Sequence, residues 1–138
     1  MRYTHWKAVT LGASTFMAAH LARTLAWQAW FDGSYDPWFL NSGRAMAFTV
    51  ALLAVAGAMV SAANRRESIV RGANAAAGAL AAMIATLAVI GPGNLFPIVI
   101  GFGAVVAVAS TGAGALAGWG MHQTRKTTSQ QGAVAASA

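Results

Sequence analysis

Four long apolar stretches separated by short polar connections constrain this chain more than any other feature of its sequence. The stretches cover residues 8–31, 42–63, 72–90 and 95–119. A helix needs roughly 20 apolar residues to cross a hydrocarbon core of about 30 Å, and each stretch approaches or exceeds that length. Because a helix satisfies its own backbone hydrogen bonds in lipid, the sequence predicts an all-α integral membrane protein with four transmembrane helices in two antiparallel hairpins.

The charges between the stretches indicate how these helices are oriented. Seven of the nine basic residues lie at the N-terminus, in the second connection or after the last stretch: Arg2, Lys7, Arg65, Arg66, Arg71, Arg125 and Lys126. Two of the three acidic residues, Asp32 and Asp36, lie in the first connection. Cytoplasmic loops carry an excess of Lys and Arg, so we expect both termini on the cytoplasmic side of a plasma membrane, such as the inner membrane of a bacterium.

The composition excludes several classes of function. Hydrophobic residues make up 57% of the chain and charged residues 9%, against about 25% charged in soluble domains. The basic residues form short flanks beside apolar stretches instead of a patch, which argues against nucleic-acid binding despite the net charge of +6. The chain has no cysteine, which excludes disulfides, thiolate metal sites and cysteine nucleophiles.

Enzyme chemistry is not expected either. The three carboxylates lie in connections, so no stretch contains an acid/base pair, and no histidine pair has the one-turn spacing of a metal site. The sequence therefore predicts no catalytic residue, no metal ligand and no cofactor.

Residues 1–126 are expected to form one four-helix transmembrane domain. Residues 127–138 are small, polar and uncharged after Lys126, which predicts a disordered C-terminal tail. The two hairpins match in plan, but the sequence does not predict an internal repeat.

Small residues recur at three- and four-residue steps within the stretches and predict where helices pack closely. Small side chains let helix backbones approach each other in lipid, where packing drives association. The pattern predicts that the third and fourth stretches pack together as a tight antiparallel hairpin. The predicted packing residues are Gly57, Ser61, Gly78, Ala82, Gly103, Gly114 and Gly118.

Polar residues in the outer half of the first hairpin are the candidate binding residues. His20 lies near the middle of the first stretch, Arg23 lies one turn further out, and Asn41 and Arg44 begin the second stretch. Ionisable residues inside a membrane commonly mark functional sites. A structural role stays open, since Arg44 can extend its charge to the surface and Arg23 can pair with a carboxylate.

A haem-binding electron-transfer subunit is one alternative. His5 and His122 are both expected near the cytoplasmic face, and the segment Arg2-Tyr3-Thr4-His5-Trp6 resembles the His-Trp start of the first helix in some membrane cytochromes b. That family holds its haem between facing histidines within the spans, whereas only His20 lies well within a stretch here.

The function favoured by the sequence is a small non-catalytic membrane subunit that packs against a larger membrane complex or against itself. Its expected partners are the lipid bilayer and either another membrane subunit or further copies of the chain.

A small transporter component or channel, with an outward-facing basic pocket for an anionic solute, is the second alternative. The segment Gly91-Pro92-Gly93-Asn94-Leu95-Phe96-Pro97 resembles a helix start in the small membrane subunit of tripartite tricarboxylate transporters. The resemblance covers seven residues, and it precedes the fourth stretch here, whereas in that family it is expected near the second.

Overall fold

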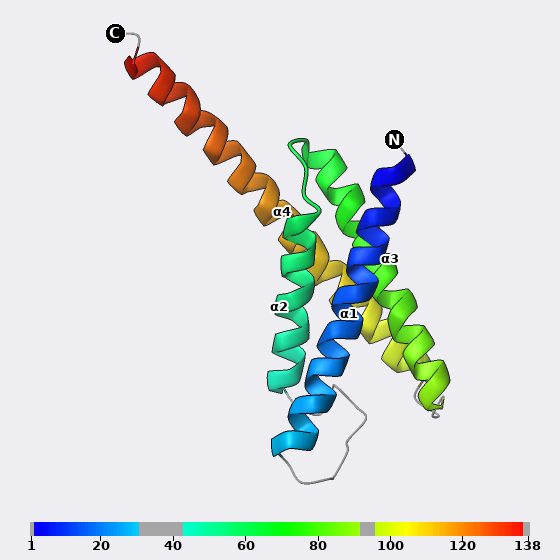
Figure 1. Ribbon diagram of the computed structural model, residues 1–138. Coiled ribbons are helices and arrows are strands. Elements are labelled where there is room, and N and C mark those ends of the chain that lie inside the picture. Colours follow the sequence, from blue (N-terminus) through cyan, green and yellow to red (C-terminus); the bar gives the residue numbers. More distant parts are fainter. Residues whose placement is uncertain (1, 31–42, 92–95, 137–138) are drawn as a thin grey trace.

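The protein is an all-helical bundle of four helices, seen here in a computed structural model that describes residues 2–30, 43–91 and 96–136 (Figure 1). The helices are α1 (Arg2–Trp30), α2 (Gly43–Met59), α3 (Arg65–Ile90) and α4 (Phe96–Ala136). Each predicted stretch corresponds to one of them. Helices α3 and α4 extend beyond their apolar stretches, since α3 begins in the basic connection and α4 continues well past Trp119. Helix α2 is shorter than its stretch and ends at Met59.

Two of the helices are long and apolar enough to cross a membrane. Among the described residues these are Arg65–Ile90 of α3 and Pro97–Ser129 of α4, and α2 contributes a shorter apolar segment, Met46–Met59. Helix α1 is not among them. It carries more polar side chains along its length, such as Thr10, Ser14 and His20.

The connection between α2 and α3 is built around one buried hydroxyl group. The Ser68 hydroxyl accepts a hydrogen bond from the Ala62 N–H at 2.8 Å, and it lies 2.9 Å from the Ala62 carbonyl oxygen and 3.1 Å from that of Asn64. The Asn64 side chain caps α3 by accepting a hydrogen bond from the Arg66 N–H at 3.0 Å. The Asn64 bond satisfies a backbone N–H that a helix start leaves without a partner, and the Ser68 bonds satisfy buried backbone groups of the connection, so the turn has a defined geometry.

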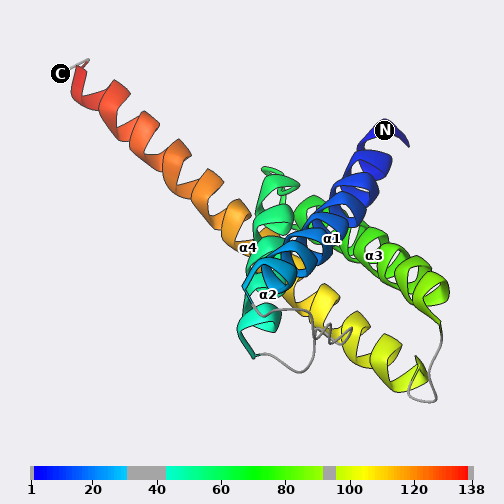
Figure 2. The same cartoon turned by 60° about the horizontal axis from the view of Figure 1, so that its bottom comes forward.

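The helices alternate in direction, so α1 runs parallel to α3 and α2 runs parallel to α4 (Figures 1 and 2). Two contacts along α1 and α3 show the parallel direction, since His5 lies beside Asn74 near the start of both helices and Met17 lies beside Thr86 further along both. The main packing partners are α1 with α3, α2 with α4, and α3 with α4, whereas no Cα atom of α1 lies within 8 Å of one of α4 among the described residues.

The two parallel pairs cross through glycines that meet backbone. A Cβ placed on Gly12 of α1 would fall well under 3.0 Å from the Ala75 carbonyl oxygen of α3, and a Cβ on Gly78 would fall equally close to the Val9 carbonyl oxygen. Real Cβ atoms do not approach other atoms so closely. The α1 and α3 backbones can therefore approach each other this closely only because both positions are glycine.

Helices α2 and α4 repeat the same reciprocal crossing. A Cβ on Gly57 would strike the Thr111 carbonyl oxygen, and a Cβ on Gly114 would strike the Ala54 carbonyl oxygen. In each pair the glycine of one helix meets the carbonyl three residues before the glycine of the other. The two crossings thus share one geometry.

This shared geometry relates the two crossings to each other, and the sequence pattern did not predict it. In each crossing a helix of the first hairpin packs on the helix at the same place in the second hairpin, α1 on α3 and α2 on α4. The residues Gly, Ala, Met, Ala, Leu and Ala occur at 12, 13, 17, 19, 21 and 22 and again at 78, 79, 83, 85, 87 and 88. Matches between alanines are expected by chance in so Ala-rich a chain. The matched positions, however, lie at equivalent places relative to the glycine crossing on α1 and on α3.

The last part of α4 covers most of the segment that the sequence assigns to a tail. The helix continues to Ala136 and projects away from the other three helices in Figures 1 and 2. The sequence from Met121 to Gln131 contains no proline or glycine to end the helix. Its threonine hydroxyls donate to carbonyl oxygens three or four residues earlier, as Thr128 does to Thr124 at 3.0 Å. Residues 137–138 lie outside the described part.

Candidate functional site

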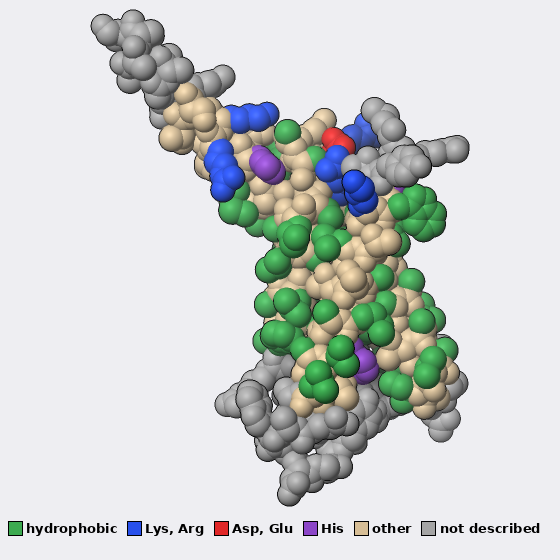
Figure 3. All heavy atoms as spheres, in the orientation of Figure 1, with side chains coloured by type: hydrophobic (Ala, Val, Ile, Leu, Met, Phe, Trp, Pro, Cys, Tyr) green, Lys and Arg blue, Asp and Glu red, His purple; other side chains and the backbone are tan. Residues whose placement is uncertain are grey.

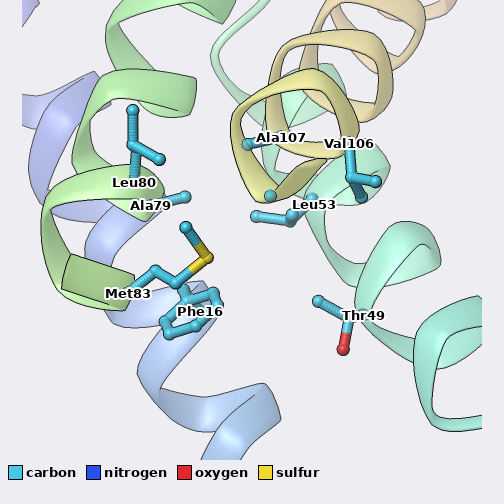
Figure 4. A pocket seen from close by; sticks show the side chains of 9 residues that line it. Phe16, Thr49, Leu53, Ala79, Leu80, Met83, Val106 and Ala107 are labelled. Carbon is cyan, nitrogen blue, oxygen red and sulfur yellow. The ribbon is translucent and has the colours of Figure 1, made fainter. Parts of the chain in front are cut away.

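A small cavity lies between the four helices near the middle of the bundle (Figure 4). Its volume is about 10 Å³, and a single water needs roughly 10–15 Å³ by the same measure. Its walls are almost entirely apolar, with one hydroxyl among them. The lining residues are Phe16, Thr49, Leu53, Ala79, Leu80, Met83, Gly103, Val106 and Ala107. The cavity is too small and too apolar to hold a solute.

The cavity is small because one methionine fills the centre of the bundle. Met83 of α3 is buried, and a Cβ on Gly103 of α4 would collide with its thioether sulfur and terminal methyl. Phe16, Leu53 and Ala107 complete this core from the other three helices. Met is unbranched and fits irregular gaps, so here it closes the space between the four helices.

The predicted binding residues are only partly described. His20 is half-buried, and its ring stacks on Phe16 with 6.5 Å between the ring centroids. Arg23 and Arg44 belong to α1 and α2, but their side chains lie outside the described part, as does Asn41 entirely. A basic pocket formed by these four residues therefore stays a prediction.

The predicted packing residues lie where helices meet, and three of them contact a helix outside the predicted hairpin. Gly78 meets α1, whereas Gly57, Gly114 and Gly118 belong to the contact between α2 and α4, where Gly118 faces the Ser61 hydroxyl. Helices α3 and α4 do pack together, through Gly103 beneath Met83 and through Gly72, where a Cβ would lie 3.0 Å from the Ala115 Cβ. The closest approaches of glycine to backbone nevertheless join the parallel helices.

The histidines do not form a shared site within the described residues. The His5 ring nitrogen Nδ1 lies 3.0 Å from Nδ2 of Asn74 on α3. His122 belongs to α4, none of whose described Cα atoms lies within 8 Å of one of α1. No group of three His, Cys, Asp or Glu residues able to hold a metal ion occurs in the part of the chain that the structure describes.

One end of the bundle gathers the positive charge (Figure 3). The described basic residues there are Lys7, Arg65, Arg66, Arg71, Arg125 and Lys126. Glu67 pairs with Arg71 within the first turns of α3, and the Arg65 guanidinium carbon lies 5.9 Å from the centroid of the Trp119 ring. The contact between Arg65 and Trp119 was not predicted, although an arginine and a tryptophan at neighbouring helix ends are the kind of pair that could have suggested it.

Beyond this basic end the described helices carry no charge over a broad band. The charge-free segments are residues 8–22, 46–64, 72–91 and 97–124. Large apolar side chains are exposed on all four helices within the band, including Leu21, Val55, Ile84 and Val105. Figure 3 shows such side chains covering the visible face below the basic end.

The chain matches no protein-family model, no curated protein and no solved structure.

Proposed function

We propose that the protein is an integral membrane protein whose four helices all span the bilayer, with both termini on the cytoplasmic side. The charge-free band with exposed apolar side chains on every helix carries this proposal. Soluble monomers rarely expose contiguous apolar patches beyond a few hundred Å², whereas lipid solvates such a surface without cost. The basic end then lies at the cytoplasmic face, in accordance with the positive-inside bias.

Within that membrane we propose that the protein acts as a non-catalytic subunit of a larger complex. Helix α4 has 41 residues and is about 61 Å long at 1.5 Å per residue, roughly twice the hydrocarbon thickness. The part after Trp119 accounts for about 25 Å, and residues 121–129 are all exposed. Isolated helices of this length are marginal in water, so a partner on the cytoplasmic side is expected to stabilise the extension.

The packing of the bundle adds a second argument for this role. The glycine contacts join helices within one chain. The cavity between the four helices is too small and too apolar to hold a solute. An accessory subunit requires neither a pathway for a solute nor a catalytic side chain. A small transporter or channel for anions is the alternative, and it depends on the pocket predicted around His20 and Arg23.

Site-directed photo-crosslinking tests this proposal. A photoreactive amino acid at Thr128, in the exposed extension, is expected to give an adduct with a different polypeptide, and that polypeptide should also co-purify with the protein in mild detergent. The control position is Ile98, an exposed apolar residue near the other end of α4, which should not give this adduct.

Two results would contradict the accessory role. Adducts that contain only further copies of the chain, together with anion flux in proteoliposomes, would favour the conduit. Absence of any adduct, with a protein that stays monomeric in both detergent and membranes, would reject both proposals.

A further inference from the structure

We propose that a cluster at the basic end binds the phosphate of an acidic phospholipid in the leaflet on that side. The cluster, called here the basic corner, consists of Arg65 and Arg66 at the start of α3 and Trp119, His122 and Lys126 on α4. This inference rests on the proposed membrane location. It assigns a specific lipid contact that the membrane location alone does not require.

Contacts between α3, α4 and the connection before α3 bring the corner together. Arg65 lies over the Trp119 ring at 5.9 Å, and the Gln123 side-chain amide donates to the Ala63 carbonyl oxygen at 3.4 Å. Helix positions three, four and seven apart share a face. His122 and Lys126 therefore lie on the same face of α4 as Trp119 and Gln123, the face turned to the start of α3.

The corner has an excess of positive charge. Glu67 is the only carboxylate among the described side chains, and it pairs with Arg71. No carboxylate in the described part bonds to Arg65, Arg66 or Lys126. The N-terminus of α3 adds a partial positive charge from its helix dipole. An anion is the ligand that this arrangement attracts.

The position of the corner identifies the anion as a headgroup phosphate. Trp119 lies within the charge-free segment of α4, six residues before Arg125, the first charged residue that follows, and tryptophan is enriched at the headgroup level of membranes. Its indole Nε1 is inaccessible to solvent, so the ring marks the depth of the corner and does not itself contact the headgroup. The guanidinium groups of Arg65 and Arg66 are donors that suit phosphate oxygens, and anionic lipids concentrate in the cytoplasmic leaflet.

Lipid binding by the purified full-length protein tests the corner. The protein in a neutral detergent is titrated with phosphatidylglycerol or phosphatidylcholine, and bound lipid is counted by native mass spectrometry. Binding of phosphatidylglycerol is expected to be preferred. It should weaken about fivefold for each arginine removed, so roughly 25-fold in the Arg65→Gln, Arg66→Gln double variant.

Arg125→Gln is the matched control for the single variants Arg65→Gln and Arg66→Gln, because each removes one positive charge and Arg125 lies on a different face of α4 from Trp119 and Lys126. A loss of under about threefold is expected for it. An equal loss in this control and in the single variants would show a diffuse attraction to the basic end and would overturn the proposal. So would the absence of any preference for phosphatidylglycerol. Thermal denaturation in the presence of inorganic phosphate is a further check. If inorganic phosphate protected the protein against heat as well as phosphatidylglycerol does, the ligand would be a free anion, and the proposal would also be overturned.

Two further measurements keep the test decisive. Should the double arginine variant not fold, Lys126→Gln, which changes an exposed residue outside the bundle core, provides the same comparison with Arg125→Gln. Membrane fractionation of the unmodified protein separates this proposal from the membrane location. If the unmodified protein is recovered in membranes but shows no preference for phosphatidylglycerol, only the basic corner is rejected. If the unmodified protein is recovered in the soluble fraction, the membrane location itself is rejected.

Discussion

Substitution of Gly78 by alanine is expected to destabilise the bundle although it adds only one methyl group. The new Cβ would fall well under 3.0 Å from the Val9 carbonyl oxygen, and that oxygen belongs to a helix backbone that cannot rotate away. Helices α1 and α3 must therefore separate. Overpacking of this kind costs about 1–3 kcal/mol, partly offset by the helix propensity of alanine, which exceeds that of glycine by up to about 1 kcal/mol.

A matched control isolates the packing contribution. A Cβ on Gly101 of α4 meets no atom within 4 Å, so Gly101→Ala gains helix propensity without any clash. The two variants should differ in free energy of unfolding by about 1–3 kcal/mol, with Gly78→Ala the less stable. Reversible denaturation in mixed micelles, followed by circular dichroism, measures this difference.

A double-mutant cycle then tests which helices are paired. Gly12 and Gly78 serve one crossing, so once either substitution separates the helices, the second should cost less, with a coupling of at least about 0.5 kcal/mol. Gly12 and Gly114 serve different crossings and should be additive within about 0.5 kcal/mol. Coupling of Gly78 with Gly114, and additivity of Gly78 with Gly12, would refute the parallel pairing in favour of the hairpin that the sequence suggested.

Two further substitutions test the connection and the predicted pocket. Ser68→Ala removes the acceptor of the buried Ala62 N–H and should lower the free energy of unfolding by about 1–3 kcal/mol. The control, Thr127→Ala on the exposed extension, should change the free energy of unfolding by less than about 0.5 kcal/mol. Equal effects of the two substitutions would mean that the hydrogen bonds of Ser68 do not stabilise the protein. Arg23→Leu should leave membrane insertion intact but weaken partner association or anion response, and unchanged behaviour in both assays would show that the predicted pocket does not exist.

The number and order of the helices could be predicted from the sequence because hydrophobic length and charge are local properties. Each apolar stretch is long enough to form one helix. The end of the third stretch at residue 90 agrees with the end of α3, where Gly91 follows with a positive φ of 110°. Its start does not agree, since the stretch begins at residue 72 and α3 begins at Arg65, after the cap formed by Asn64. The small residues also indicated correctly that backbones approach closely.

The partners of those small residues could not be predicted in the same way. Gly78 and Gly114 require a close neighbour, but nothing in a stripe of glycines specifies which helix supplies it. Short connections suggested sequential hairpins, whereas the closest approaches join helices that are separated by one other helix. The likeness of the two crossings was hidden for the same reason, since half of the residue matches are alanines and its evidence is the reciprocal contact of Gly12 with Ala75 and of Gly78 with Val9.

The candidate sites depend even more on tertiary contacts. The sequence singled out His20 because it is polar within an apolar stretch, and the structure adds its stacking on Phe16. Arg65 and Trp119 are 54 residues apart in the chain, and only the packing of α4 beside the start of α3 brings them into contact. The extension of α4 is a further case, because a small polar composition does not by itself exclude a helix.

The orientation of the chain in the membrane is the central claim, and cysteine labelling in intact cells tests it directly. The chain has no cysteine of its own, so single cysteines at Ser34, between the first two helices, and at Ser129, in the α4 extension, give unambiguous signals. A membrane-impermeant thiol reagent should label Ser34→Cys in intact cells and label Ser129→Cys only after the membrane is opened. Labelling of both positions from the same side would contradict the four-span topology.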